Sequence, residues 1–337
     1  MRHYKERPFR INKRHRAETI GFRKVTSPDL PNPKAVLLPP MYSFLTTSPW
    51  PDYELLDSGN FQKLERFGRY VLSRPEPQAV WDPHLPQSEW DRAHATFTRE
   101  KGANAATEKG QWKLKPGMAE QWVISYERPD GLKLRFRLGL SSFKHVGLFP
   151  EQDPNWQFIY EQTMKRRAEK PRVLNLFAYT GAATLAARAA GADVTHLDSV
   201  KQVNFWARDN MEASGLDGVR WLVEDAFKYV QREVKRGNKY QGLILDPPSY
   251  GRGPNGEKWQ LEDQLNEMLK LCRELLDPQD HFYVINLYSI GFSALILDNL
   301  MDTIYTPYGR QREIGEIYLQ DRGQRKLPLG TFCRFAN

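Results

Sequence analysis

The sequence predicts an α/β protein, built on a parallel sheet with helices on both faces and preceded by a small β-rich domain. Residues 171–184 read P-R-V-L-N-L-F-A-Y-T-G-A-A-T, which is an apolar run, a turn of small residues and the start of a helix. A short apolar run without regular polar alternation is typical of a strand buried on both faces of a parallel sheet. Four further strand–helix units and two terminal strand-like stretches follow it.

Length and composition allow two domains and a sizeable core. The chain has 337 residues, more than one sheet domain of about 150 residues needs. No apolar stretch reaches the roughly 18 residues of a membrane span, and the basic amino terminus contains more acids and less serine than a transit peptide would. The two cysteines, Cys272 and Cys333, have neither metal-ligand nor disulfide spacing, which predicts a cytoplasmic protein without a metal site.

The basic balance of the chain makes a polyanionic partner plausible. The net charge is +8, although such a charge also simply keeps a protein soluble. Residues 1–52 are predicted to be a flexible basic arm, because their first part is rich in Arg and Lys and prolines interrupt the rest. The arm could contact phosphates or remain a solvated tail, and the sequence favours neither.

Residues 53–146 are predicted to form the small β-rich domain. Residues 63–72 alternate polar and apolar side chains, as a half-exposed strand does. Residues 121–126 and 132–138 are further strand candidates joined through a Pro-Asp-Gly turn. Arg and Lys alternate with Trp, Tyr and Phe here, which would suit contact with RNA, but half-buried sheets show the same alternation by default, and this structural interpretation is favoured.

The strand–helix units follow in regular order from residue 147 to the end of the chain. Strands are predicted at 192–198, 219–223, 240–245 and 281–287, and helices at 155–168, 182–190, 200–214, 226–235, 258–276 and 293–301. Two strand-like stretches, 315–319 and 330–335, end the chain. Sheets of this kind bind ligands at the carboxyl ends of their strands, so the residues that follow the strands are the site candidates.

Acidic residues end the second and third strands of this sheet. Asp198 lies about as far beyond Gly181 as the acid that binds ribose in a nucleotide-binding unit. A carboxylate suits this task because it accepts two hydrogen bonds from a vicinal diol. Asp225 could likewise accept from an adenine amino group. Both residues could instead only cap the helices that follow them.

The turn after the first strand has a single glycine, Gly181, among the alanines 178, 182 and 183. A dinucleotide site uses several glycines, as G-x-G-x-x-G, so that backbone amides can approach the pyrophosphate. A cofactor without phosphate does not impose that requirement. The turn therefore argues against NAD and is compatible with S-adenosylmethionine.

Asp246-Pro247-Pro248-Ser249-Tyr250, at the end of the fourth strand, is the strongest local motif. Two prolines remove backbone donors and fix φ, which leaves free carbonyls in a rigid turn. The Asp246 carboxylate and a proline carbonyl would make an acceptor pair for an exocyclic amine, and Tyr250 could stack on a planar base. The alternative is a stiff turn that only ends the strand, but the position of the motif favours function.

Residues 147–335 resemble a class I S-adenosylmethionine-dependent methyltransferase, with its Rossmann-like sheet and antiparallel terminal hairpin. The combination of N-L-F-A-Y-T-G-A-A-T, an aspartate after the second strand and D-P-P-x-Y resembles the bacterial ribosomal large-subunit RNA methyltransferases, which act on guanine N2 or cytosine C5. The resemblance covers somewhat over half of the chain. It implies S-adenosylmethionine as cofactor and RNA, above all ribosomal RNA, as partner, and it is much more specific for the cofactor than for the substrate.

The resemblance also implies a set of site residues within the predicted domain 147–337. The methionine side of the cofactor would be lined by Asn175, Phe177, Ala178, Tyr179, Thr180 and Gly181. Asp198 with Ser199 would hold the ribose and Asp225 with Ala226 the adenine, while Phe149 and Gln152 would close the pocket. The catalytic set would be Asp246, Pro247, Pro248 and Tyr250.

One departure separates the two chemistries of that family. Cytosine C5 becomes nucleophilic only after a thiolate adds at C6, so its methylation needs a cysteine. No cysteine stands in the D-P-P-S-Y motif or at the end of the fifth strand, and the two cysteines present are expected to be inert packing residues. An N-methyltransferase needs no covalent catalyst, because positioning the amine can supply several kcal/mol. A target in a duplex would have to be extruded into the pocket.

N-methylation of a base in RNA is therefore the leading interpretation. One alternative keeps the cofactor but methylates a protein amide or a small molecule, since an amide is also planar. Another is a non-catalytic RNA-binding protein with a cofactor-free sheet, and the intact Asp198 and D-P-P-S-Y argue against it. An NAD oxidoreductase is the weakest alternative, because the first turn lacks the required glycines.

Overall fold

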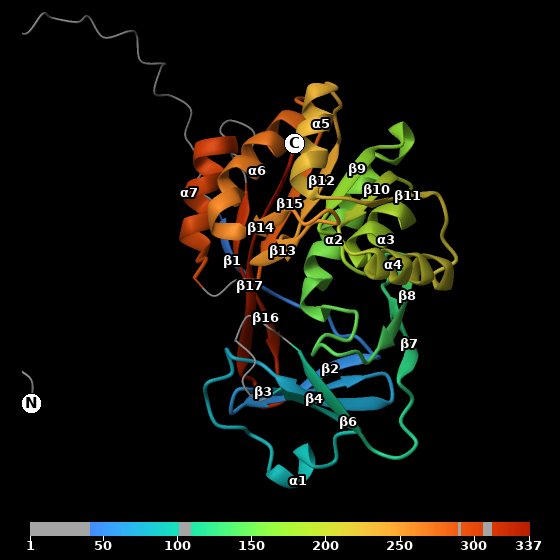
Figure 1. Ribbon diagram of the computed structural model, residues 1–337, viewed down its shortest axis with the longest axis vertical. Helices are drawn as coiled ribbons and strands as arrows, with labels where there is room; N and C mark the ends of the chain where they lie inside the picture. Colours follow the sequence, from blue (N-terminus) through green and yellow to red (C-terminus); the bar gives the residue numbers. More distant parts are fainter. Residues whose placement is uncertain (1–40, 101–108, 289–290, 306–311) are drawn as a thin grey trace, which may run out of the picture. The chain divides into compact units, whose positions relative to one another are not determined.

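The computed structural model describes residues 41–100, 109–288, 291–305 and 312–337 (Figure 1). Leu38–Asn337 form one compact unit. Most of the predicted basic arm, residues 1–40, lies outside the described residues. Within the described ranges, no helix has the length and apolar character that a membrane crossing requires.

An eight-stranded sheet forms the framework of the larger part of this unit. Its strands lie in the order β1-β16-β17-β15-β12-β9-β10-β11. Their bounds are β1 Met41–Thr46, β9 Arg172–Leu176, β10 Asp193–Asp198, β11 Val219–Val223, β12 Gly242–Leu245, β15 Phe282–Leu287, β16 Glu313–Gln320 and β17 Lys326–Ala336. All neighbours are parallel except at β17, which is antiparallel to both β15 and β16. The predicted parallel sheet with an antiparallel terminal hairpin is confirmed.

Helices cover both faces of this sheet (Figure 1). They are α2 Asp153–Lys165, α3 Ala182–Ala189, α4 Lys201–Ala213, α5 Ala226–Lys235, α6 Leu261–Leu275 and α7 Ala294–Tyr305. Each face of the sheet has its own apolar cluster. Ile244 and Val284 pack with α2 and α3 on one face, whereas Leu243, Leu245 and Ile285 pack with α5, α6 and α7 on the other. Successive strand residues point to opposite faces, so both faces must be apolar, which explains the uninterrupted apolar runs in the sequence.

A second, five-stranded sheet has the order β2-β3-β4-β5-β6. Its strands are β2 Tyr53–Gly59, β3 Gln62–Phe67, β4 Tyr70–Pro75, β5 Ala95–Arg99 and β6 Gly110–Leu114, with the short helix α1 Gln87–Trp90 between β4 and β5. The hairpin β7 Gln121–Glu127 and β8 Lys133–Gly139 is separate from it. The predicted β-rich region is therefore present, and its Pro-Asp-Gly turn joins β7 to β8 as expected.

The structure differs from the sequence prediction at three elements. The predicted strand 63–72 is a hairpin, because Gly68 takes a positive φ of 58° and reverses the chain between β3 and β4. The helix predicted from residue 258 begins at Leu261, because residues 258–260 instead pair with residues 250–252 as strands β14 and β13. Met41–Thr46, inside the predicted arm, form strand β1 beside β16.

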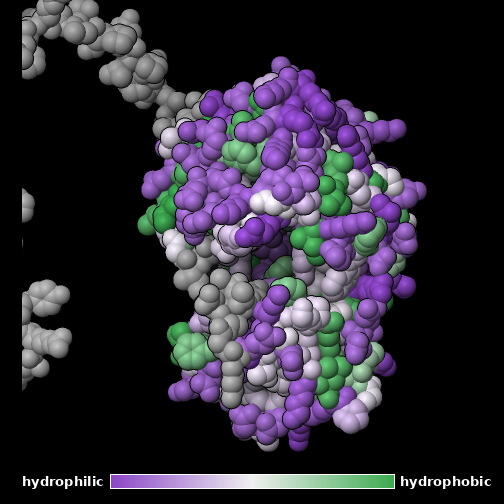
Figure 2. All heavy atoms as spheres, viewed as in Figure 1, coloured by the Kyte–Doolittle hydropathy of each residue, from purple (hydrophilic) through white to green (hydrophobic). Residues whose placement is uncertain are grey.

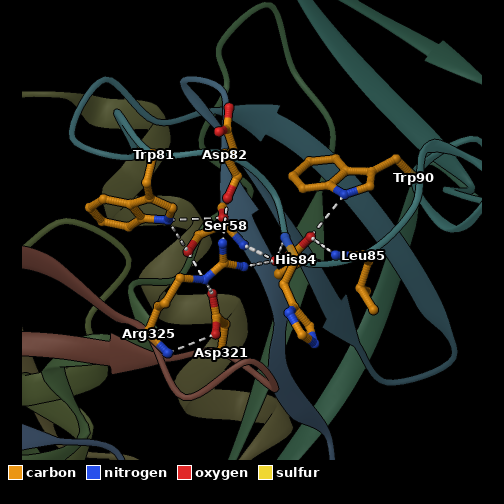
Figure 3. Close-up of polar contacts among 9 residues, drawn as sticks. Ser58, Trp81, Asp82, His84, Leu85, Trp90, Asp321 and Arg325 are labelled. Carbon is orange, nitrogen blue, oxygen red and sulfur yellow. Dashed lines mark hydrogen bonds and ion pairs between the residues drawn. The ribbon is translucent and has the colours of Figure 1, made fainter.

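The buried carboxylate of Asp57 joins the five-stranded sheet to the terminal hairpin of the large sheet, and Figure 3 labels its partners Arg325, His84, Leu85 and Trp90. Asp57 lies at the end of β2 and forms an ion pair with Arg325, which precedes β17. Arg325 Nε also contacts Asp321 at 3.1 Å, and Asp321 accepts from the Ser58 hydroxyl at 2.8 Å. Asp57 further accepts, at 2.8–3.1 Å, from Ser58 N, His84 N, Leu85 N and Trp90 Nε1. The Asp57 carboxylate is thus the centre of this hydrogen-bond network.

Replacing Asp57 should destabilise the protein strongly. We expect Asp57→Ala to lower the free energy of unfolding by about 3–5 kcal/mol, because it removes one of the two acidic partners of Arg325 and leaves several buried donors without their acceptor. Asp217→Ala is the control: Asp217 pairs with Arg188 but is 92% exposed, so its loss should cost less than about 1 kcal/mol. Urea unfolding measures both variants, and equal values would contradict this account.

Candidate active site

Most of the predicted site residues lie at the ends of four neighbouring strands of the large sheet, β12, β9, β10 and β11. The strands β15, β12, β9, β10 and β11 lie side by side and run parallel, so their carboxyl ends share one edge. The chain leaves β9 towards β10 on one side, whereas β12 continues to β15 on the other. This change of direction between β9 and β12 is the position at which doubly wound sheets bind ligands.

The turn after β9 has an unusual backbone conformation. Phe177 and Tyr179 have φ angles of 56° and 48°, and Gly181 has 89°. Left-handed non-glycine residues cost about 1–3 kcal/mol each and persist only where surrounding contacts hold them. Here the Thr180 hydroxyl donates to Gly147 O at 2.7 Å, and the Thr180 carbonyl accepts from the side chain of Asn210, on α4, at 2.9 Å. The turn is therefore fixed in a conformation that it would not adopt alone.

Asp198 holds the same turn from the neighbouring strand. Its two carboxylate oxygens accept from Tyr179 N and Val200 N, each at 2.9 Å. Burial raises the pKa of Asp198, and these two amides oppose that shift. The N-cap of α4 is Val200, which makes no side-chain capping bond. Asp198 therefore links two strand ends, rather than capping the following helix.

Asp225 does have a capping role. It is the N-cap of α5, and its Oδ1 accepts from Lys228 N at 2.9 Å. The alternative interpretation of Asp225 as a helix cap is thus correct for one of its oxygens. Its Oδ2 makes no hydrogen bond to the described residues, and Ala226 follows it as the first residue of the helix.

Asn175 is placed differently from the other predicted site residues. It lies within β9, is buried, and donates to Thr184 Oγ1 on α3 at 2.9 Å. Thr184 Oγ1 in turn lies 2.9 Å from His196 Nδ1 on β10. Burial lowers the pKa of His196 to about 3, so the imidazole is neutral. The side-chain amide of Asn175 is therefore already used in a hydrogen bond within the protein, to Thr184.

The D-P-P turn presents free acceptors at the end of β12. Asp246 Oδ1 accepts from Asn286 Nδ2 at 3.0 Å, and burial raises the pKa of Asp246 to about 6. Among the described residues, no donor reaches Asp246 Oδ2 or the Pro247 carbonyl. The Pro248 carbonyl accepts from Trp259 Nε1 at 2.7 Å. Asp246 Oδ2 and the Pro247 carbonyl oxygen, on adjacent residues, can therefore both accept a hydrogen bond from a ligand.

Trp259 and Asn286 contact the predicted site residues but were not among them. The Trp259 ring packs on Phe177, with centroids 4.8 Å apart, and so connects the turn after β9 to the D-P-P turn. Asn286 is the polar residue of the otherwise apolar strand β15, F-Y-V-I-N-L, a signal that could have identified it. No local signal points to Trp259, because its position depends on the pairing of β13 with β14.

Residues before α2 line the same region. The Phe149 ring lies 5.3 Å from the Tyr179 ring and 5.0 Å from His145, centroid to centroid. Gln152 accepts from Asn155 Nδ2 at 2.9 Å. Glu151, between them, is buried, and its Oε2 has no hydrogen-bond partner within the described residues. Burial raises the pKa of Glu151 to about 7.

The surface and the remaining candidate groups are consistent with this location. On the face shown in Figure 2 the molecule is hollowed near its middle, beside the place of β13 and β14 in Figure 1. A separate hollow of about 380 Å³ lies on the five-stranded sheet and has no predicted site residue in its lining.

Cys272 and Cys333 are buried, and burial raises the pKa of both thiols. As expected from the sequence, they are inert packing residues. The described parts of the chain hold no cluster of three or more metal-ligating side chains.

Comparison with known proteins identifies the class of protein that this sheet and site define. The chain belongs to the S-adenosylmethionine-dependent methyltransferase family, whose family model matches residues 92–304. The predicted family, enzyme class and cofactor are therefore confirmed. A crystal structure of a SAM-dependent methyltransferase from Agrobacterium tumefaciens is similar, with 37% sequence identity and a TM-score of 0.80, over 88% of this chain and 95% of that one.

More distant relatives share parts of the chain. A ribosomal RNA large subunit methyltransferase K/L from Shewanella frigidimarina is 28% identical over 57% of this chain, and one from Hahella chejuensis is 29% identical over 50%. The chain spans about a quarter of the length of these curated relatives. A Streptococcus mutans structure with 15% identity and a TM-score of 0.64 shares the fold.

Removing the acid at position 151 should make the protein more stable, and only at higher pH. The folded-state pKa of about 7 lies above the unfolded value near 4.3. The protonated acid therefore favours the folded state at low pH, and this contribution is lost as pH rises through 7. We expect the free energy of unfolding of Glu151→Gln to exceed that of the wild type by about 2–4 kcal/mol at pH 8 and to approach it near pH 4, below the unfolded pKa. Urea unfolding at both pH values measures this, and a pH-independent difference would contradict it.

Proposed function

We propose that the protein transfers a methyl group from S-adenosylmethionine to an exocyclic amine of a base in ribosomal RNA. The observation that carries the proposal is the D-P-P turn, in which Asp246 Oδ2 and the Pro247 carbonyl have no donor among the described residues. Two acceptors on a rigid turn match the two N–H groups of a planar amine.

The edge of the sheet offers suitable partners for the cofactor. Asp198 would bind the ribose hydroxyls through its remaining lone pairs, with Ser199 beside it, because its backbone contacts fix its orientation. Asp225 would accept from the adenine amino group through Oδ2, next to Ala226. The methionine part would lie over Phe177, Ala178, Tyr179, Thr180 and Gly181, in front of Asn175. Phe149 and Gln152 would close the pocket.

When bound, S-adenosylmethionine supplies an electrophilic methyl group on a sulfonium. Asp246 and the Pro247 carbonyl would accept the two N–H hydrogens and so turn the nitrogen lone pair towards that methyl group. Pro248 keeps the turn rigid, and Tyr250, 52% exposed, would stack on the base. As the N–C bond forms and the methyl–sulfur bond breaks, leaving S-adenosylhomocysteine, the nitrogen would lose a proton. Asp246, with a pKa of about 6, is ionised at pH 7.5 and can accept it.

RNA is the substrate class that the features of the chain favour. The net charge of +8 suits a polyanion, and relatives that match half of the chain or more are named ribosomal RNA large subunit methyltransferases. The buried thiols support N-methylation over cytosine C5 methylation, which requires an exposed thiolate. We further propose that the domain 53–146 helps to hold the RNA, and that the enzyme acts in the cytoplasm.

Asp246→Ala should abolish methyl transfer while leaving the cofactor site intact. We expect transfer to fall by at least about 100-fold, a typical loss for removal of one positioned polar group. The affinity for S-adenosylhomocysteine should change less than about threefold, because Asp246 is assigned to the substrate. Radiolabel transfer and calorimetric titration measure the two quantities. Asp193→Ala, at the opposite end of β10, is the matched control and should retain activity.

Mass spectrometry of ribosomal RNA identifies the product in the cell. Large-subunit RNA from cells without the protein should lack one methyl group on a base nitrogen. Wild-type protein should restore that group, and Asp246→Ala should not. A complete set of methyl groups in the deletion strain would overturn the assignment to ribosomal RNA, and normal activity of Asp246→Ala would overturn the catalytic assignment.

A further inference from the structure

A small hairpin separates the D-P-P turn from helix α6. Strands β13 Tyr250–Arg252 and β14 Lys258–Gln260 pair antiparallel, with Tyr250 opposite Gln260 and Arg252 opposite Lys258. Alternate strand residues point to opposite faces, so these four side chains share one face, and all four are exposed. The other face, with Gly251 opposite Trp259, is turned inwards, and Trp259 is buried.

The hairpin is fixed at both ends. At its base, Trp259 donates to the Pro248 carbonyl at 2.7 Å and packs on Phe177. At its tip, Glu257 accepts from Lys228 Nζ, on α5, at 2.7 Å and from Asn255 N at 2.9 Å. The hydrogen bond from Lys228 lowers the pKa of Glu257 to about 2, so this contact persists at neutral pH. The exposed face therefore has a set position relative to Asp246.

The two cations of this face are not neutralised. Among the described residues, Arg252 and Lys258 form neither an ion pair nor a hydrogen bond through their side chains, and the acids Glu262 and Asp263 at the start of α6 are not paired with them. At the neighbouring helix α5, by contrast, Lys228, Arg232 and the C-cap residue Arg236 have acidic partners. Unpaired cations beside an exposed aromatic ring are typical of single-stranded nucleic-acid sites.

We propose that the β13–β14 hairpin grips the RNA next to the target base, with Arg252 and Lys258 bound to the phosphates that flank the target nucleotide. The inference rests on the proposed function and extends it to the binding surface. Tyr250 lies on the same face as Arg252, two residues before it, which is about 7 Å along the strand. A base stacked on the Tyr250 ring would therefore place its own backbone near the two cations. Phosphate contacts of this kind fix register and orientation and are independent of sequence.

The test compares two pairs of charge removals. The double variant Arg252→Gln/Lys258→Gln removes the cations of the hairpin. Lys165→Gln/Lys235→Gln is the matched control, because both lysines are exposed and lie at the carboxyl ends of α2 and α5, away from the D-P-P turn. The probe is protein-free large-subunit ribosomal RNA from cells lacking the protein. Its affinity is measured between 50 and 200 mM salt, together with methyl transfer.

The hairpin variant should bind this RNA at least about tenfold more weakly at 50 mM salt. The slope of log affinity against log salt should become less steep by about 1.4, since each phosphate contact on a single strand contributes about 0.7. Its calorimetric affinity for S-adenosylhomocysteine should equal that of the wild type, which also shows that the variant is folded. The control pair and the charge-conserving variant Arg252→Lys/Lys258→Arg should both retain the wild-type slope.

These experiments distinguish a failure of the hairpin assignment from a failure of the proposed function. If the wild type methylates this RNA and the hairpin variant keeps the wild-type affinity and slope, the hairpin assignment is overturned and the proposed function stands. If the wild type transfers label to a ribosomal protein of assembled subunits and never to RNA, the proposed function is overturned and the hairpin assignment falls with it.

Discussion

The contact between Asp198 and the backbone amide of Tyr179 is the constraint on which the site depends. It joins the ends of β9 and β10 at 2.9 Å and helps to hold a turn in which Phe177 and Tyr179 have positive φ angles. Such a turn is costly unless its surroundings fix it. Because Asp198 uses both oxygens for backbone amides, its remaining lone pairs have a defined direction, which suits the ribose contact proposed for it.

The same turn is supported from both neighbouring parts of the structure. Asn210, on α4, donates to Thr180 O and accepts from Arg137 N of β8, so the β7–β8 hairpin is connected to the turn through one side chain. On the other side, Trp259 connects the turn to the D-P-P segment. Tyr288, after β15, donates to Glu76 at the end of the five-stranded sheet. The regions predicted for cofactor, substrate and RNA are thus joined by direct contacts, which gives a physical reason for their occurrence in one compact unit.

The sequence was sufficient where the structural signal is local. The apolar run of β9, the helix Ala226–Lys235 and the D-P-P turn follow from periodicity and proline placement, and the structure has them where they were expected. Features that depend on distant pairing were not predictable. Strand β1 forms because Met41–Thr46 pair with β16, far along the chain, and the role of Trp259 requires the β13–β14 pairing. The polar residue Asn286 in an otherwise apolar strand was visible in the sequence. Its hydrogen bond to Asp246 was not, because the two residues are 40 positions apart in the chain.

Calorimetric titration with S-adenosylhomocysteine at pH 7.5 tests the central claim most directly, namely that the cofactor lies at the strand ends fixed by Asp198. The variant for comparison is Asp198→Asn, which keeps one acceptor oxygen, for Tyr179 N, but removes the charge and the acceptor for Val200 N. Loss of a charged hydrogen bond costs about 1.5–3 kcal/mol, so the account predicts an affinity at least about tenfold weaker in a variant that still unfolds cooperatively in urea. An unchanged affinity in a folded variant would contradict it.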